Sequence, residues 1–138
     1  MLEIRKVSEP GEREQAFAIR HEVFVIGQNC APDEEYDGLD DYCLHLLALL
    51  DGKVVGTCRI RKTEKGIKLE RFAVLEEARG NGVGKALVGK CLELEKEAEY
   101  IYLHAQEHAL DFYQALGFRM YGDRFWEAGI PHFAMNWV

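Results

Sequence analysis

Apolar residues along the chain recur at a two-residue period in some stretches and at a helical period in others. Alternation and short apolar runs are typical of strands, whereas apolar residues at i, i+3, i+4 and i+7 predict an amphipathic helix. These patterns predict strands at 2–7, 44–50, 53–63, 67–74, 100–105, 118–125 and 132–138. They predict helices at 12–25, 83–94 and 109–116.

Turn residues indicate how these elements follow one another. Asp51-Gly52 favours a tight hairpin, and a second turn at Lys65-Gly66 leads into the strand at 67–74. Three antiparallel strands are therefore expected in succession. The strand, helix, strand order that follows implies a parallel pair. The expected fold class is α/β (α+β), a single domain over residues 1–138 with a mixed, mostly antiparallel sheet and flanking helices.

The strand at 67–74 changes parity along its length. Ile67 and Leu69 place apolar side chains at odd positions, but Phe72 and Val74 place them at even ones. A strand buried on both faces would show no parity at all. Alternatively, a β-bulge near residues 70–72 would accommodate one extra residue and free backbone groups that a ligand could use. The sequence leaves both readings open.

A glycine-rich corner, RGNGVGK at 79–85, directly precedes the central helix. The first turn of a helix offers unpaired N–H groups and a positive dipole end, so a pyrophosphate-type anion can bind there if the backbone is accessible. From Arg79 to Cys91 there are basic residues and no acidic one. Lys85 stands where a dinucleotide fingerprint needs glycine, and Ala86 stands where a P-loop needs a hydroxyl. A plain turn before the helix is the alternative.

Composition narrows the class of protein. A chain of 138 residues, 48% hydrophobic and 30% charged, suits one domain. Its acidic balance, with a net charge of −7, disfavours nucleic acid as a partner. We expect no membrane span, because the apolar runs are short, and a cytoplasmic location, because the N-terminus resembles no signal peptide. Four cysteines without C-x-x-C spacing predict neither disulfides nor a metal site.

The segment 29–41 contains six acidic residues and no basic one. A solvated loop is one interpretation. The other is an electrostatic mouth that concentrates a cationic amine, since a cleft lined by one sign of charge attracts the opposite sign. The acids are Asp33, Glu34, Glu35, Asp37, Asp40 and Asp41.

Arg79, Gly82 and Gly84 form R-x-x-G-x-G, which resembles the pyrophosphate-binding signature of the GNAT superfamily of acyl-CoA-dependent N-acyltransferases. A second segment looks like the family's N-x-x-A-x-x-x-Y-x-x-x-G-F, with Gln106 in place of the usual asparagine and Tyr113 at the tyrosine. Further segments are similar to an ElaA-like subfamily, although Gly27 stands where that subfamily tends to have glutamate. They are 20–25, Gln28, 34–37, His45, 69–71 and 128–132.

The resemblance implies that the strands at 67–74 and 100–105 splay apart at their C-terminal ends and make a slot for pantetheine. It implies acetyl-CoA, or coenzyme A, as cosubstrate, and a primary amine of a small molecule or peptide as acceptor. Backbone groups of Phe72, Ala73 and Val74 would hold the acyl carbonyl and the pantetheine amides. The rest of the expected binding set is Arg79, Gly80, Asn81, Gly82, Val83, Gly84, Lys85 and Gln106.

By the same resemblance, Tyr113 would protonate the departing thiolate. Glu70 is our first candidate for the base, directly or through water, with His132 and Glu35 in reserve; a surface carboxylate paired to Arg71 or Lys68 is the alternative for Glu70. His21, His45, His104 and His108 have weaker claims. A non-catalytic module that binds coenzyme A is the rival function. Because the strand at 132–138 could pair with a second copy, a homodimer is a further expectation.

Overall fold

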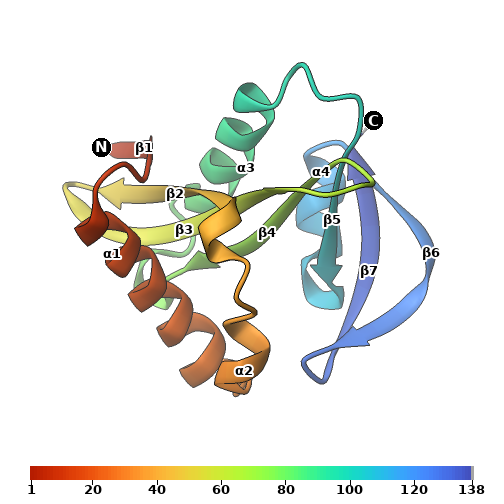
Figure 1. Cartoon of the computed structure of the whole chain (residues 1–138), viewed down its shortest axis with the longest axis horizontal. Coiled ribbons are helices and arrows are strands. Elements are labelled where there is room, and N and C mark those ends of the chain that lie inside the picture. Colours follow the sequence, from red (N-terminus) through yellow and green to blue (C-terminus); the bar gives the residue numbers. More distant parts are fainter. Residues whose placement is uncertain (138) are drawn as a thin grey trace.

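The computed structural model of the chain describes residues 1–137, except for the side chains of Asp33 and Glu34. Three expectations therefore lie outside the described residues, namely Val138 in the last strand and the two acids of segment 29–41. Seven strands form one sheet in the order β1-β2-β3-β4-β5-β7-β6 (Figure 1). Among the described residues, β4 and β5 are the only strands that pair in parallel, as the predicted fold class requires.

The strands lie close to the predicted ranges. The helical stretches 10–26, 83–94 and 107–115 lie close to the three predicted helices, and the other short helices lie in connecting segments. The strands are β1 Leu2–Lys6, β2 Cys43–Leu50, β3 Lys53–Lys62, β4 Ile67–Val74, β5 Ile101–Gln106, β6 Phe118–Glu127 and β7 Ile130–Trp137. The helices are α1 Pro10–Arg20, α2 Pro32–Glu35, α3 Val83–Leu94 and α4 Leu110–Ala115. A π-helix, η1, spans His21–Ile26, and short 3₁₀ turns lie at η2 Asp40–Tyr42, η3 Glu76–Ala78 and η4 Glu107–Ala109.

The predicted helix at 12–25 was wrong in two respects. It begins at Pro10, a residue suited to the first helical turn, where its missing N–H is not needed. It then widens into η1, which ends with the Gly27 N–H donating to the carbonyl of Glu22 at 2.9 Å. A Cβ atom at position 27 would lie 2.6 Å from the Val23 carbonyl oxygen, so this π-helical ending requires glycine.

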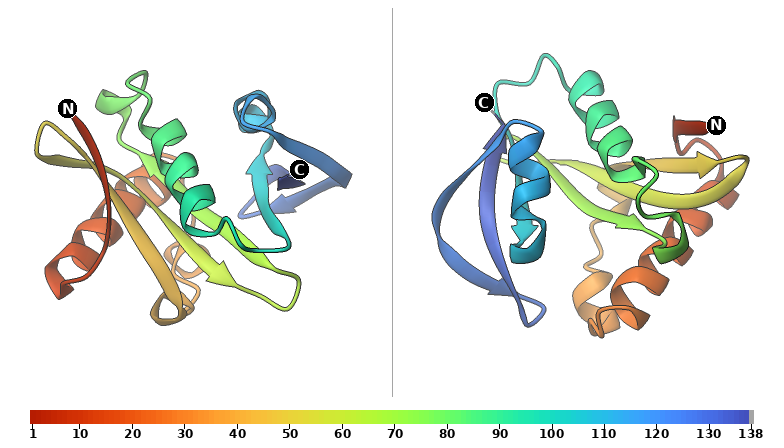
Figure 2. Two further views of the ribbon diagram at one scale, coloured as in Figure 1. Left: turned by 90° about the horizontal axis from the view of Figure 1, so that it is seen from above. Right: turned by 180° about the vertical axis from the view of Figure 1, so that it is seen from behind.

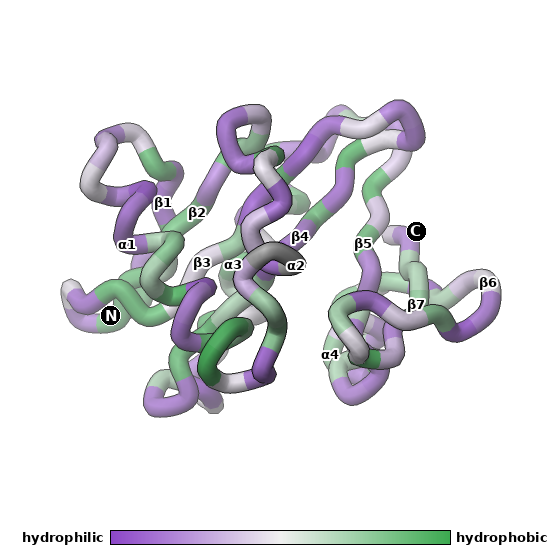
Figure 3. The backbone as a smooth tube through the Cα atoms, turned by 60° about the horizontal axis from the view of Figure 1, so that its bottom comes forward, coloured by the Kyte–Doolittle hydropathy of each residue, from purple (hydrophilic) through white to green (hydrophobic). Residues whose placement is uncertain are grey.

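Helices cover both faces of the sheet. Helix α3 packs on one face of β2–β4, and α1 packs on the other (Figure 2). The main core joins α3, α4 and the sheet, with Leu46, Leu69, Leu87, Leu103 and Met135 each at most 2% exposed. A smaller cluster under α1 and η1 includes Ile19, Val23, Phe24 and Leu75. In Figure 3, α4, β6 and β7 stand apart from the part that carries α1–α3.

The parity slip in β4 is a β-bulge. Arg59 pairs with Glu70, but Thr57, two residues away on β3, pairs with Ala73, three residues away on β4. The extra residue is accommodated at Arg71, which has a left-handed φ of 57°. Parallel pairing with β5 ends just before this point, at Leu69 and Leu103. Beyond it the two strands separate, as expected (Figure 1).

The packing of β3 against α3 leaves no room for a side chain at Gly56. A Cβ atom there would lie 3.0 Å from Val83 Cγ1 and 3.1 Å from the Ala73 carbonyl oxygen. We predict that Gly56→Ala lowers the free energy of unfolding by about 1–3 kcal/mol, the usual cost of overpacking. Chemical denaturation measures this change.

Gly89→Ala is the matched control. Gly89 is an exposed position inside α3, and a Cβ atom there would meet nothing within 4 Å. This substitution should raise the free energy of unfolding by about 0.5–1 kcal/mol, because alanine loses less conformational entropy in a helix. A Gly56→Ala protein as stable as the unmodified chain would contradict the close packing described above.

Candidate active site

A cleft of about 1400 Å³ opens where β4 and β5 separate. Its walls come from the C-terminal halves of both strands, the end of η1, the start of α3, one side of α4 and the β6–β7 turn. Phe72, Val74 and Gln106 line it, as do Arg79, Gly80 and the segment 82–85. The structure therefore brings most of the predicted cofactor-binding residues to one cavity.

The glycine corner exposes backbone beside this cleft. Gly80 and Gly82 have left-handed φ values of 86° and 76°, and a Cβ atom at either position would meet nothing within 4 Å. Arg79 Nε donates to the carbonyl of Val74 at 3.2 Å, and Asn81 Nδ2 donates to that of Ala78 at 2.9 Å. These side chains fold back on the chain and hold the corner in shape while the backbone faces the cavity.

Helix α3 begins at this corner with free amides. Gly82 is its N-cap, and its first intrahelical bond runs from the Ala86 N–H to the Gly82 carbonyl at 3.0 Å. The N–H groups of the first turn, before Ala86, therefore have no carbonyl partner within the helix. Lys85 adds a positive charge to the same wall. The positive end of the helix dipole and the positive charge of Lys85 both favour a phosphate group at this site.

Tyr113 comes from α4 and reaches the cleft from the core side of the sheet. Its side chain packs edge-on against Phe72, Phe112 and Phe118 with ring centroids 5.0–6.1 Å apart, and it is 8% exposed. Burial, with the nearby thiols Cys58 and Cys91, raises the pKa of Tyr113 above its ordinary value. The phenol therefore keeps its proton at neutral pH.

Gln106 makes a different contact from the one expected. Its side-chain amide exchanges two hydrogen bonds with that of Gln28, at 2.9 Å and 3.3 Å, and His108 Nε2 lies 2.6 Å from its oxygen. The pair joins the end of β5 to the loop after η1, across the mouth of the cleft. The amide that replaces the family's asparagine thus bridges two walls. Its predicted role in holding the cofactor stays a prediction.

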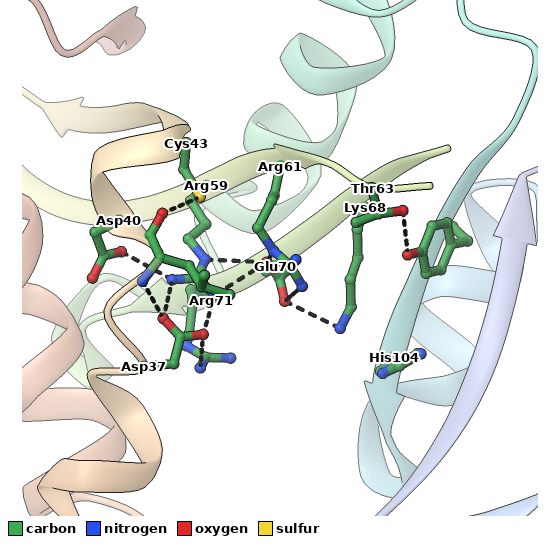
Figure 4. Close-up of polar contacts among 12 residues, drawn as sticks. Asp37, Asp40, Cys43, Arg59, Arg61, Thr63, Lys68, Glu70, Arg71 and His104 are labelled. Carbon is green, nitrogen blue, oxygen red and sulfur yellow. Dashed lines mark hydrogen bonds and ion pairs between the residues drawn. The ribbon is translucent and has the colours of Figure 1, made fainter. Parts of the chain in front are cut away.

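Glu70 occupies the centre of a cluster of cations (Figure 4). Its carboxylate contacts Arg61 Nε at 2.7 Å, Lys68 Nζ at 3.1 Å and Arg59 Nη2 at 3.1 Å, and the residue is 7% exposed. Burial alone would raise the pKa of Glu70, but these contacts outweigh it and lower the pKa to about 2. A carboxylate so strongly stabilised is a poor proton acceptor, so this environment disfavours the base role that the sequence suggested.

The acidic segment is folded against arginines from three other elements. Arg20 of α1 donates to Asp40 at 2.6 Å and pairs with Glu35, and both the Arg20 and the Glu35 side chains are at most 3% exposed. Arg59 of β3, fully buried, contacts Asp37 at 2.7 Å and Asp40 at 3.0 Å (Figure 4). The alternative of an amine-attracting mouth is therefore corrected for Glu35, Asp37 and Asp40, because arginines neutralise these carboxylates. Glu35, the second of the two reserve candidates for the base, is likewise paired with arginines, Arg20 and Arg71.

The profile of the family described as an acetyltransferase (GNAT) domain matches residues 10–138 of the chain. The chain belongs to the GNAT acetyltransferase family. It is 39% identical to the uncharacterized N-acetyltransferase YjcF of Bacillus subtilis, over 87% of this chain and 88% of that one. It is 36% identical to the protein ElaA of Escherichia coli, over 85% of this chain and 81% of that one.

Solved structures of other proteins show the same fold. The crystal structure of Escherichia coli ElaA superposes with a TM-score of 0.88, at 30% identity and over the whole of both chains. An aminoglycoside 6′-N-acetyltransferase complexed with coenzyme A superposes with a TM-score of 0.76, at 16% identity, over 97% of this chain and 95% of that one. The predicted ElaA-like GNAT membership is thus confirmed by the family match and by ElaA. The family supports acyl transfer as the general activity.

Two histidines of this GNAT domain face the cleft with defined ring orientation. His132 Nδ1 lies 2.7 Å from the carbonyl oxygen of Ile130 and its ring stacks on Phe125, 5.9 Å between centroids. His104 Nδ1 lies 2.8 Å from Glu127 Oε1. The hydrogen bond from His104 is the main cause that lowers the pKa of Glu127, despite the burial of that carboxyl.

From the sequence alone His104 has only a weak claim to a catalytic role, and Glu127 is not identified. One signal was available, since residues 100–105 alternate and His104 falls opposite the core positions Leu103 and Ala105. The partner could not be found in that way, because Glu127 lies 23 residues further on. Within residues 1–137, leaving aside the two undescribed side chains, no helix is long and apolar enough to cross a bilayer and no His, Cys, Asp and Glu cluster is placed to hold a metal.

The stability of the GNAT domain should depend on the ionised state of Glu70. Its folded pKa of about 2 lies below the ordinary value of 4.5, so its contribution is complete above pH 4.5 and is lost as the pH falls toward 2. We predict that Glu70→Gln makes the fall in unfolding free energy across this pH window shallower. Urea denaturation at a series of pH values measures it.

Glu3→Gln, at an exposed position of β1, is the control and should leave the slope with pH unchanged. An equally steep loss of stability in the Glu70→Gln protein would mean that the Arg59, Arg61 and Lys68 contacts do not favour the folded state.

Proposed function

We propose that the chain transfers an acetyl group from acetyl-CoA to a primary amine of a small molecule or peptide, by direct attack in a ternary complex. One observation carries this proposal. The glycine corner and the gap between β4 and β5 open into the same cleft, so an anion site and a slot for an extended arm are continuous. Acyl-coenzyme A has these two parts, a diphosphate and a pantetheine chain.

The residues of the corner fit the diphosphate. Amides of the segment 80–85 would take the phosphate oxygens, since two open glycines allow close approach and Lys85 supplies charge. The freed edge of β4 at Phe72, Ala73 and Val74 would hold the pantetheine amides and the acyl carbonyl. The coenzyme A complex of the aminoglycoside 6′-N-acetyltransferase, which shares this fold, supports the choice of ligand.

The chemistry requires deprotonation of the amine and protonation of the thiolate. An alkyl amine with a pKa near 10.4 is charged at pH 7, and removing its proton costs about 4.6 kcal/mol, or ~3.4 units at 1.36 kcal/mol each. Its lone pair then attacks the thioester carbonyl, and the sulfur leaves as the C–S bond breaks. Tyr113 is the proposed proton donor to that sulfur, since its buried phenol is protonated and lines the cleft.

Thermal shift and thiol release test the proposal together. Acetyl-CoA and coenzyme A should each raise the melting temperature, whereas divalent metals should not. Acetyl-CoA with spermidine, kanamycin, glucosamine or a lysine-containing peptide should then release free thiol with at least one amine. Stabilisation without thiol release for any amine would instead favour the binding-module function. No stabilisation by either compound would contradict the proposal.

Tyr113→Phe removes the proposed acid and keeps the aromatic packing. We predict a kcat lower by about 10- to 100-fold, because the thiolate is a fair leaving group and needs only modest assistance. The KM for acetyl-CoA should change little, since the ring still fills its site. Initial-rate measurement of thiol release gives both constants. An unchanged kcat would remove Tyr113 from the mechanism.

Lys85→Glu reverses a charge at the proposed diphosphate site. Glutamate in the first turn of α3 suits the helix dipole, so the fold should tolerate it. We predict an about 10-fold weaker Kd for coenzyme A, corresponding to ~1.4 kcal/mol. Isothermal titration measures it, and Lys96→Glu, at an exposed position after α3, is the control with the same change of net charge. Equal affinities of the two variants would place the diphosphate elsewhere.

A further inference from the structure

His104 lies at the point where the central sheet divides. Leu103, its neighbour, is the last residue of β5 that pairs with β4, so His104 is the first residue beyond the parallel ladder. Leu103, His104 and Ala105 all line the cleft, but Leu103 and Ala105 belong to the main core, whereas the intervening His104 alternates to the opposite face of the sheet. Figure 4 shows its ring on the side of β5 that faces Lys68 and Glu70 of β4.

A carboxylate fixes the protonation pattern of this ring. Nδ1 of His104 lies 2.8 Å from Oε1 of Glu127, and an ionised carboxylate can only accept a hydrogen bond. Nδ1 therefore carries the proton, and in the neutral ring Nε2 has the free lone pair. Among the described residues, Nε2 has no hydrogen-bond partner. The ring of Phe125 packs edge-on against the His104 ring, with 5.0 Å between their centroids, and further restricts its orientation.

We propose that Nε2 of His104 is the general base that deprotonates the acceptor amine, with Glu127 as the positioning residue that holds the ring and stabilises the imidazolium. This inference rests on the proposed function and names a base that it leaves open. A base must reach both the amine and, after proton transfer, a stabilising partner. His104 meets both conditions from one site, since its side chain is 26% exposed and that of Glu127 is 40% exposed.

The other candidates lack one of these conditions. Glu70 is buried under Arg59, Arg61 and Lys68, which stabilise its charged form. His132 is 7% exposed and its Nδ1 contacts a neutral backbone carbonyl. Glu127 lies near enough to act on His132 through its charge, but among the described residues its hydrogen bond goes to His104.

The division of the sheet also separates the two proton-transfer groups. Tyr113 belongs to the main core under α3 and α4, and His104 lies on the other face of β5. A thioester held between the strands would present its sulfur toward one face and receive the amine from the other. Acid and base then act on different atoms of the tetrahedral intermediate, as direct transfer requires.

The proton balance closes with these groups alone. Nε2 takes one proton from the ammonium, and the imidazolium passes it to water. The amine lone pair forms the C–N bond, and Nε2 then accepts the second proton from the nitrogen. Collapse of the intermediate restores the carbonyl and breaks the C–S bond. The thiolate takes a proton from Tyr113. Water then carries the proton of the imidazolium to the Tyr113 phenolate, so that both groups regain their starting states. One proton is released per amide and free thiol formed.

The test uses the full chain, acetyl-CoA and the amine of the panel that releases thiol fastest. We expect His104→Gln to lower kcat by about 100-fold and Glu127→Gln by about 10-fold, within the range of general base catalysis. His21→Gln, at an exposed position in η1, is the matched control and should stay within about twofold. The Kd for acetyl-CoA should be unchanged in all three variants, which shows that the cleft is intact.

Two readouts distinguish a base from a structural histidine. Imidazole added to His104→Ala should restore thiol release in proportion to its concentration. Methoxyamine is neutral at pH 7, so no ammonium proton has to be removed from it. The His104→Gln substitution should therefore reduce the rate of thiol release less with methoxyamine than with the alkyl amine. A His104→Gln protein within about threefold of the unmodified kcat, or equal losses with both amines and no rescue, would overturn the inference.

The failure of the proposed function would look different. If the unmodified chain binds acetyl-CoA but releases no thiol with any amine, acyl transfer to these acceptors fails, and the base assignment fails with it. If the unmodified chain turns over and the histidine variants do too, only the base assignment fails.

Discussion

The loss of pairing between β4 and β5 is the feature on which the rest of the molecule depends. It is produced by a single extra residue, Arg71, in left-handed backbone conformation, a state that costs about 1–2 kcal/mol for a residue with a Cβ atom. Ion pairs offset this cost. Arg71 contacts Glu35 at 2.9 Å and Asp37 at 3.4 Å, so the strained residue is tied to the acidic segment. Charge in one loop thus keeps a slot open in the sheet.

The acidic segment therefore acts as an internal structural element. Asp37 and Asp40 bind Arg59, a fully buried arginine in the middle of β3, which also reaches Glu70 on β4. A buried ion pair adds little stability over apolar packing, but removing one partner leaves an unpaired charge, which costs several kcal/mol. Such a network favours one arrangement of loop and sheet over others. It fixes one wall of the cleft in place before any ligand binds.

Local features were readable from the sequence. The Asp51-Gly52 hairpin, the start of α3 directly after the glycine corner and the positions of the strands each depend on residues that are close together in the chain, and each was found as predicted. The sequence left two interpretations of β4, a β-bulge or a strand buried on both faces. The shift in register against β3 identifies the bulge. Gln106, by contrast, could be assigned only by resemblance, and its contact with Gln28 spans 78 residues.

Charge partners were the least predictable part, for the same physical reason. The six acids looked alike in sequence, since nothing local connects them to Arg20 or Arg59. The His104–Glu127 pair depends on β6 and β7 folding back so that β7 lies beside β5. Periodicity and turn chemistry are encoded by neighbouring residues and can be predicted from the sequence. Contacts that only the order of strands in the sheet creates cannot be predicted in this way.

Gly84 has a consequence for the size of the opening. A Cβ atom at this position would lie 3.3 Å from Cζ of Phe112, which also lines the cleft. An alanine at position 84 would therefore displace the Phe112 ring by a few tenths of an ångström. The missing methyl group thus determines where this ring stands between the first turn of α3 and α4.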